Sequence, residues 1–153
     1  MADEHSCIHE KIIIGLCILT AISILWVSGY EDTSPSVTRD TQYFTVSGPS
    51  NSVKSLLELN PDALNERVSF IMGQDSKPLN IKLISPAETD EICLGHEACA
   101  DVGGPDIYMT AGYIWEGSAW VLAHELCHSY GVRDQETCNI IAGDMFPEHL
   151  RSR

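Results

Sequence analysis

The amino-acid sequence predicts an α+β domain with a short mixed sheet, preceded by a separate apolar segment. Three observations support this prediction. Residues 12–29 contain no charged side chain. Short strand and helix patterns follow without an internal repeat, as expected of a small α+β domain. The last helix pattern contains two histidines four residues apart, His124 and His128, with Glu125 next to the first.

The composition suits one globular domain and disfavours two classes of partner. The chain has 153 residues, of which 44% are hydrophobic and 20% charged. Nine Lys and Arg residues stand against 22 Asp and Glu residues, which gives a formal charge of −13. Proteins bind nucleic acid through clusters of Lys and Arg. We therefore expect no nucleic acid partner, and the same charge disfavours adsorption to anionic lipids.

Residues 1–30 are predicted to form a membrane-targeting segment. The uncharged run at 12–29 is near the minimum length that spans a bilayer. It could be a signal peptide cleaved after the small residues that end at Gly29. It could also be an uncleaved N-terminal anchor, which the long acidic leader favours, whereas a buried structural helix is the less favoured alternative. With either kind of targeting segment, we expect the following domain to be secreted or membrane-anchored, outside the cytosol.

The next elements are marked by polar residues and prolines. Residues 31–41 are polar and predict a linker, so the domain itself is expected over 42–153. Residues 42–46 alternate weakly and predict a short strand. A helix should follow with Val53, Leu56 and Leu57 on one face, and a second should run from Pro61 to Gly73.

Two strands and a final helix complete the expected domain. Residues 79–84 alternate apolar and polar side chains, which is typical of a strand with one buried face. Residues 106–110 predict another strand after a glycine-rich turn. Ser118 could cap the last helix, which would continue to Tyr130 and end at Gly131.

Four cysteines lie in the expected domain, and an even number favours disulfides in an oxidising compartment. Three pairings are possible. Cys93 and Cys99 close a short glycine-containing loop and form the obvious local pair. Cys127 and Cys138 would then tie the last helix to the segment after it. A cysteine-rich metal site is the competing interpretation, but the sequence lacks paired CxxC units.

The final helix carries the pattern His-Glu-x-x-His. Two histidines four residues apart lie on one face of a helix, so their ring nitrogens can converge on one Zn²⁺ ion. Zinc lowers the pKa of a bound water to about 7. Glu125, beside His124, could accept a proton from that water. These residues predict a zinc site able to hydrolyse a peptide bond.

Residues 124–134, HELCHSYGVRD, resemble the zincin metallopeptidases, in the metzincin form with Asp in third place as in snapalysin-like enzymes. The resemblance implies a zincin-like metallopeptidase domain in which His124, His128 and Asp134 bind Zn²⁺ and Glu125 is the general base. It also implies that strand 106–110 holds an extended substrate and that Gly143 to Pro147 forms the methionine turn. Only six residues follow that turn, too few for the usual C-terminal helix.

The third zinc ligand has a second candidate. Residues 134–142 could form another helix with Asp134 as its N-cap. Zincins of the gluzincin type take a Glu from such a helix, which would make Glu136 the ligand. The usual Glu-x-x-x-Asp/Asn pattern is not met, because Gln135 stands four residues before Asn139. His149 is a third, weaker candidate.

The predicted function is therefore zinc-dependent endopeptidase activity on a peptide or protein substrate. The alternative is a catalytically inactive, zinc-stabilised binding or effector module on the extracytoplasmic side. Tyr113 and Tyr130 could donate a hydrogen bond to an oxyanion, but packing is the preferred role of both. We expect Trp120 in the core and His96 on the surface.

Overall fold

The computed structural model describes residues 31–112, 114 and 116–146. The chain divides into two compact units, Met1–Tyr30 and Glu31–Arg153. The predicted targeting segment therefore lies outside the described residues. Among the residues that are described, no helix has both the length and the apolar character needed to cross a membrane.

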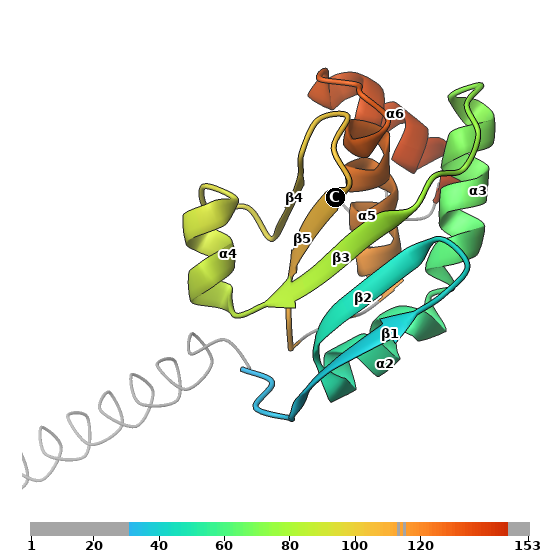
Figure 1. Cartoon of the computed structure of the whole chain (residues 1–153). Helices are drawn as coiled ribbons and strands as arrows, with labels where there is room; N and C mark the ends of the chain where they lie inside the picture. Colours follow the sequence, from blue (N-terminus) through green and yellow to red (C-terminus); the bar gives the residue numbers. More distant parts are fainter. Residues whose placement is uncertain (1–30, 113, 115, 147–153) are drawn as a thin grey trace, which may run out of the picture. The chain divides into compact units, whose positions relative to one another are not determined.

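The described unit is an α+β domain built on a mixed five-stranded sheet, as predicted (Figure 1). The strands lie in the order β1-β2-β3-β5-β4, with parallel pairs in the middle and an antiparallel pair at each edge. Their bounds are β1 Ser36–Asp40, β2 Phe44–Pro49, β3 Leu79–Ile84, β4 Ala98–Ala100 and β5 Asp106–Thr110.

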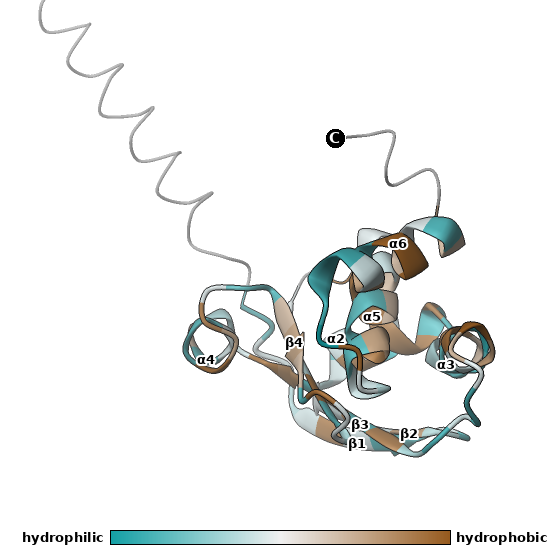
Figure 2. Ribbon diagram, turned by 90° about the horizontal axis from the view of Figure 1, so that it is seen from above, coloured by the Kyte–Doolittle hydropathy of each residue, from teal (hydrophilic) through white to brown (hydrophobic). Residues whose placement is uncertain are grey.

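The helices are α2 Ser50–Glu58, α3 Pro61–Ile71, α4 Pro86–Ile92, α5 Glu116–Ser129 and α6 Gln135–Met145. Of these, α2, α3, α5 and α6 contain core residues and lie on one side of the sheet (Figure 2). The alternating strand residues that face α2, α3 and α5 are almost completely buried, and removal of this apolar surface from water stabilises the fold. Leu79, Ile81 and Ile107 belong to the same buried cluster as Leu56, Leu122 and Leu126 from the helices.

Strands 79–84 and 106–110 are confirmed with the predicted bounds. Alternation succeeds here because each strand has one buried and one half-exposed face. The strand predicted at 42–46 begins at Phe44 and extends to Pro49 instead. Helix α5 begins at Glu116, so Ser118 lies inside the helix and the predicted cap is wrong. Gly131 ends the helix as predicted, with φ +97° and its N–H bonded to the carbonyl of His128.

The prediction of a linker at 31–41 is wrong for Ser36–Asp40, which forms β1. The segment before this strand is also fixed, because the Asp32 carboxylate accepts hydrogen bonds from the N–H and hydroxyl of Ser52 at the start of α2. The methionine turn implied at Gly143 to Pro147 is wrong as well. Gly143, Asp144 and Met145 belong to α6, and Met145 packs in the core.

Candidate functional site

Helix α5 places the predicted chemistry at the boundary between the core and a cleft. Its apolar residues Leu122, Ala123 and Leu126 are fully buried against the sheet. His124 and His128, one turn apart, are also almost completely buried, with 7% and 5% of their surfaces exposed. Histidines so deep in a domain need polar partners, because an unpaired buried polar group costs free energy.

The two imidazole rings face each other. Their Nε2 atoms are 3.1 Å apart and their ring planes meet at 79°. The Nδ1 of His128 donates a hydrogen bond to the carbonyl of Val132, at 2.6 Å. This bond fixes the ring and leaves Nε2 as the nitrogen that carries a lone pair, which is the usual arrangement of a metal-binding histidine.

Helix α6 supplies the side chain that meets His124. The Nε2 of His124 lies 2.6 Å from the Oε1 of Gln135, the first residue of α6. Burial lowers the pKa of His124, although hydrogen bonds to Gln135 and to Asn139, one turn further along α6, oppose this. A neutral imidazole is the form that binds metals. Gln135 was not among the metal ligands predicted from the sequence. The signal was the Gln at the position where the gluzincin pattern has Glu.

A disulfide holds α6 against α5. Both predicted pairs, Cys93–Cys99 and Cys127–Cys138, are confirmed. Cys127 and Cys138 are fully buried, and the Sγ of Cys138 lies 3.6 Å from the Nδ1 of His128. The disulfide therefore lies next to the imidazole of His128. It connects α5, which carries both histidines, to α6, which carries Gln135.

Glu125 is the third buried polar group of the motif. Burial raises the pKa of Glu125 to about 7, although the charge of His128 and a hydrogen bond from the backbone of Ala100 act in the opposite direction. A carboxylate with a pKa near neutrality can both accept and return a proton under physiological conditions. Glu125 lines the same cleft as the paired imidazoles.

A cleft of about 390 Å³ opens between β4 and the motif. Residues from β4 and its flanks form one wall, and α5 with the start of α6 forms the other. The lining residues are His96, Ala98, Cys99, Ala100, Val102, His124, Glu125, His128, Arg133 and Gln135. His96 is exposed at this cleft, as predicted.

The strand that borders the cleft is β4, whereas β5 had been expected there. β5 lies between β3 and β4, so its backbone groups are paired on both sides and cannot hold a substrate. The N–H of Asp101 bonds to the carbonyl of Asp106, and the N–H of Thr110 bonds to the carbonyl of Glu97. Glu97 and Asp101, on either side of β4, therefore direct their backbone groups toward β5. Because bonding alternates along an antiparallel pair, Ala98 and Ala100 direct their backbone groups into the cleft.

Asp134 and Glu136 are not brought to the histidines. Asp134 is exposed, and its carboxylate caps α6 by accepting hydrogen bonds from the N–H and hydroxyl of Thr137. The predicted second helix is therefore present, but Glu136 is exposed on it. Among the residues that the structure describes, no third His, Cys, Asp or Glu joins the pair. His149 and Tyr113 lie outside the described residues.

Tyr130 does not face the cleft. Its hydroxyl donates to the Oδ1 of Asn65 at 2.6 Å and lies near the N–H of Lys77, so its role is structural packing, as preferred. Trp120 is buried, as expected, and its ring stacks on His124 with centroids 5.5 Å apart. Its indole limits the movement of that imidazole.

The donors fit a zinc ion. Two nitrogens bound tetrahedrally to one zinc, each at about 2.0–2.1 Å, lie about 3.3 Å apart, close to the separation of the two Nε2 atoms. The Oε1 of Gln135, a neutral oxygen 2.6 Å from the Nε2 of His124, provides a third donor atom for the metal. The Nδ1 of His124 is buried without a hydrogen-bond partner among the described residues.

No family model matches this chain, and neither a curated protein nor a solved structure matches it. The fold and site therefore define its class: a disulfide-containing α+β domain with a paired-histidine candidate metal centre beside an edge strand. The two disulfides are compatible with an extracellular location.

Proposed function

We propose that this protein is a zinc-dependent endopeptidase with a zincin-like site, secreted or anchored in a membrane by residues 1–30. The observation that carries the proposal is the pair of Nε2 atoms 3.1 Å apart on α5, with the buried Glu125 between their residues. Two facing imidazoles are costly to bury without a partner. They are also the ligands that zinc binds in proteins.

His124, His128 and Gln135 would hold the ion in this proposal. Zinc bound there would polarise the scissile carbonyl and acidify a water molecule. Glu125 would accept the proton of that water and return it to the leaving amine, which its pKa of about 7 favours. Trp120 and the carbonyl of Val132 would keep the imidazoles in place.

An extended peptide would lie along β4. The N–H and carbonyl of Ala98 and the carbonyl of Ala100 point into the cleft and can pair with a peptide strand. The N–H of Ala100 already bonds to the Glu125 carboxylate, so the peptide backbone and the general base would meet at this residue. The cleft side chains on β4 are small, which leaves room for the substrate.

A second candidate function rests on Gln135. A neutral amide oxygen is a weaker zinc ligand than the carboxylate that a gluzincin places on this helix. The chain could therefore be a catalytically inactive, zinc-stabilised binding or effector module. This alternative keeps the metal and the fold but has no turnover.

The test is a comparison of zinc content and hydrolysis in the full chain. We expect about one zinc per chain, measured by mass spectrometry of the metal, and peptide release from casein. Glu125→Gln should retain zinc and lose about 10²- to 10⁴-fold in activity, which is the usual contribution of a general base. Glu136→Gln, the same change at an exposed site, is the control.

His128→Ala should lose zinc, whereas His96→Ala, in the same cleft, should keep it. Retention of zinc by His128→Ala would contradict the metal site. A wild-type chain that binds zinc but cleaves neither casein nor a broad peptide library would contradict the endopeptidase and leave the binding module.

A further inference from the structure

The opposite edge of the sheet is also open. Strand β1 pairs only with β2 in the part of the chain that the structure describes. The flanking bonds from Thr41 to Phe44 and from Ser50 to Pro35 show that the odd-numbered residues of β1 bond to β2. Because bonding alternates, the N–H and C=O groups of Ser36, Thr38 and Asp40 point away from the sheet.

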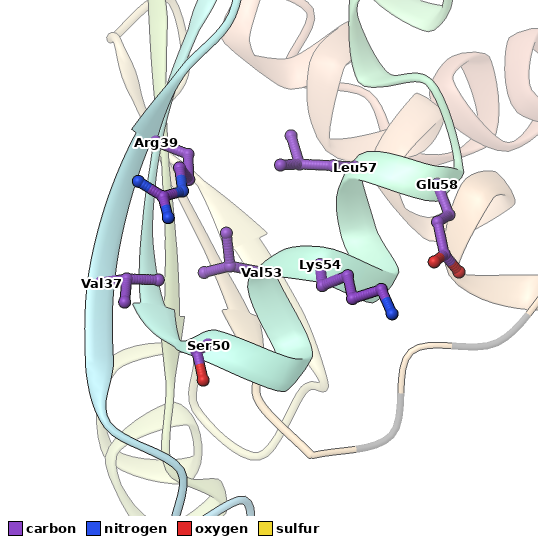
Figure 3. A pocket seen from close by; sticks show the side chains of 7 residues that line it. All are labelled: Val37, Arg39, Ser50, Val53, Lys54, Leu57 and Glu58. Atoms are coloured by element: carbon purple, nitrogen blue, oxygen red, sulfur yellow. The ribbon is translucent and has the colours of Figure 1, made fainter.

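A groove of about 470 Å³ lies between this strand and α2 (Figure 3). Val37, Val53 and Leu57 form its apolar surface, and in Figure 3 the side chains of Val53 and Leu57 point toward β1. Val53 is buried, whereas Val37 and Leu57 are half-buried. The groove therefore leaves apolar surface accessible directly beside unpaired backbone groups.

The same groove carries positive charge. Arg39 on β1 and Lys54 on α2 line it, although the whole chain has only nine Lys and Arg residues. Neither forms an ion pair with another described residue, whereas Lys82 elsewhere on the sheet is paired with Asp106. Glu58 is the single acidic lining residue. An anionic group would therefore find an unpaired cation here.

These three features together describe a site for an extended chain. An unpaired strand edge supplies main-chain hydrogen bonds, and an adjacent groove accepts alternate side chains of an added strand. A small amphipathic molecule could use the apolar surface and Arg39, but it would leave the backbone groups of Ser36, Thr38 and Asp40 unused. A peptide uses all three features.

We propose that β1 and α2 bind an extended peptide segment of a partner protein, in which an apolar and an acidic residue stand two positions apart and therefore share one face, as Val37 and Arg39 do on β1. The segment adds to β1 as a sixth strand. One apolar side chain lies between Val37, Val53 and Leu57, and a carboxylate of the segment pairs with Arg39. The site is independent of zinc, since it lies at the edge of the sheet away from β4.

The test uses the full chain and a fluorescein-labelled peptide of eight residues, in which threonine alternates with valine and aspartate, so that valine and aspartate share one face of the strand. Binding is followed by fluorescence anisotropy. Arg39→Glu should weaken binding by about tenfold or more. Arg67→Glu, the same change at an exposed residue of α3, should leave it unchanged. A peptide with lysine in place of aspartate should bind the wild-type chain more weakly, because lysine is repelled by Arg39.

Two further measurements examine the backbone pairing. Thr38→Pro removes an outward N–H without removing a bond to β2 and should abolish binding, with folding checked by circular dichroism. The bound peptide should protect the amides of Ser36, Thr38 and Asp40 from hydrogen exchange. Protection at Ala98 and Ala100 instead, equal losses for both arginine variants, or no binding would overturn the proposal. A chain dimer that the peptide does not dissociate would also overturn it.

Discussion

The two edges of the sheet have the same architecture but different chemistry. At each edge an outer strand lies beside a helix and a groove, of about 390 Å³ at β4 and about 470 Å³ at β1. The groove at β4 is lined by His124, Glu125 and His128, whereas the groove at β1 is lined by aliphatic side chains and cations. A strand and a helix create each groove, and the side chains that line it decide what it can bind.

The two edges are also held by different interactions. Cys93–Cys99 fixes the loop before β4, and Cys127–Cys138 fixes α6 to α5. At the β1 edge, carboxylates hold the chain: Asp32 binds Ser52, and Asp62 accepts hydrogen bonds from the hydroxyl of Thr41 and the N–H of Tyr43. Reductants should therefore destabilise the β4 edge, whereas acid should destabilise the β1 edge.

The largest effect that would test this comparison is loss of the buried disulfide. Replacement of Cys127 and Cys138 by Ala should lower the free energy of unfolding by about 2–5 kcal/mol. The same change at Cys93 and Cys99 should cost less, because their closed loop is shorter, with a separation of 6 against 11 residues, and Cys99 is only half-buried. Denaturant titration of both double variants provides the measurement. Absence of any loss in the Cys127 and Cys138 variant would show that packing alone holds α6 against α5.

A smaller effect is expected from the third donor. Gln135→Glu should tighten zinc binding by about tenfold, or about 1.4 kcal/mol, because a carboxylate adds a negative charge to the site. Competition against a zinc chelator measures the affinity. Glu136→Gln, one residue away and exposed, should change nothing. If both variants bind zinc like the wild type, Gln135 is not a ligand.

The smallest effect concerns Asp32 and acid. Hydrogen bonds from Ser52 and Ser34 lower the pKa of Asp32 from its usual 3.8 to about 2. A carboxyl group whose pKa is lowered by folding stabilises the protein above its unfolded pKa, and this stabilisation is lost as the pH falls toward the folded pKa.

Asp32→Asn should therefore cost about 1 kcal/mol or less at neutral pH, since Asp32 is only half-buried, and this difference from the wild type should disappear between about pH 4 and pH 2. Denaturant midpoints at several pH values would show this. Asp75→Asn, at an exposed site, should follow the wild type throughout. A constant difference between Asp32→Asn and the wild type would mean that ionisation of Asp32 is irrelevant.

Local patterns were sufficient where one periodicity dominates. β3 and β5 alternate because one face of each is buried, and the spacing of His124 and His128 places both on one face of a helix whatever surrounds it. The cysteine pairs were also predictable, since four cysteines with one short loop leave few arrangements.

Local patterns failed where an element depends on its neighbours. The polar residues of β1 form a strand because β2 supplies its hydrogen bonds, and β4 has only three residues, too few for a detectable period. The capping box of Ser85 and Glu88 at α4 was present in the sequence and could have predicted that helix. For β1 no comparable local signal exists.

The sequence alone therefore determined the histidine pair, Glu125 and the helix that carries them, because residues three or four apart are neighbours in any helix. Only the tertiary structure decided the third donor and the strand at the cleft. Gln135 meets His124 because α6 packs on α5, and Asp134 is occupied as a cap at the start of α6. β4 borders the cleft because the sheet order places it at the edge. Such contacts between elements are set by packing of whole surfaces, which no short window of sequence contains.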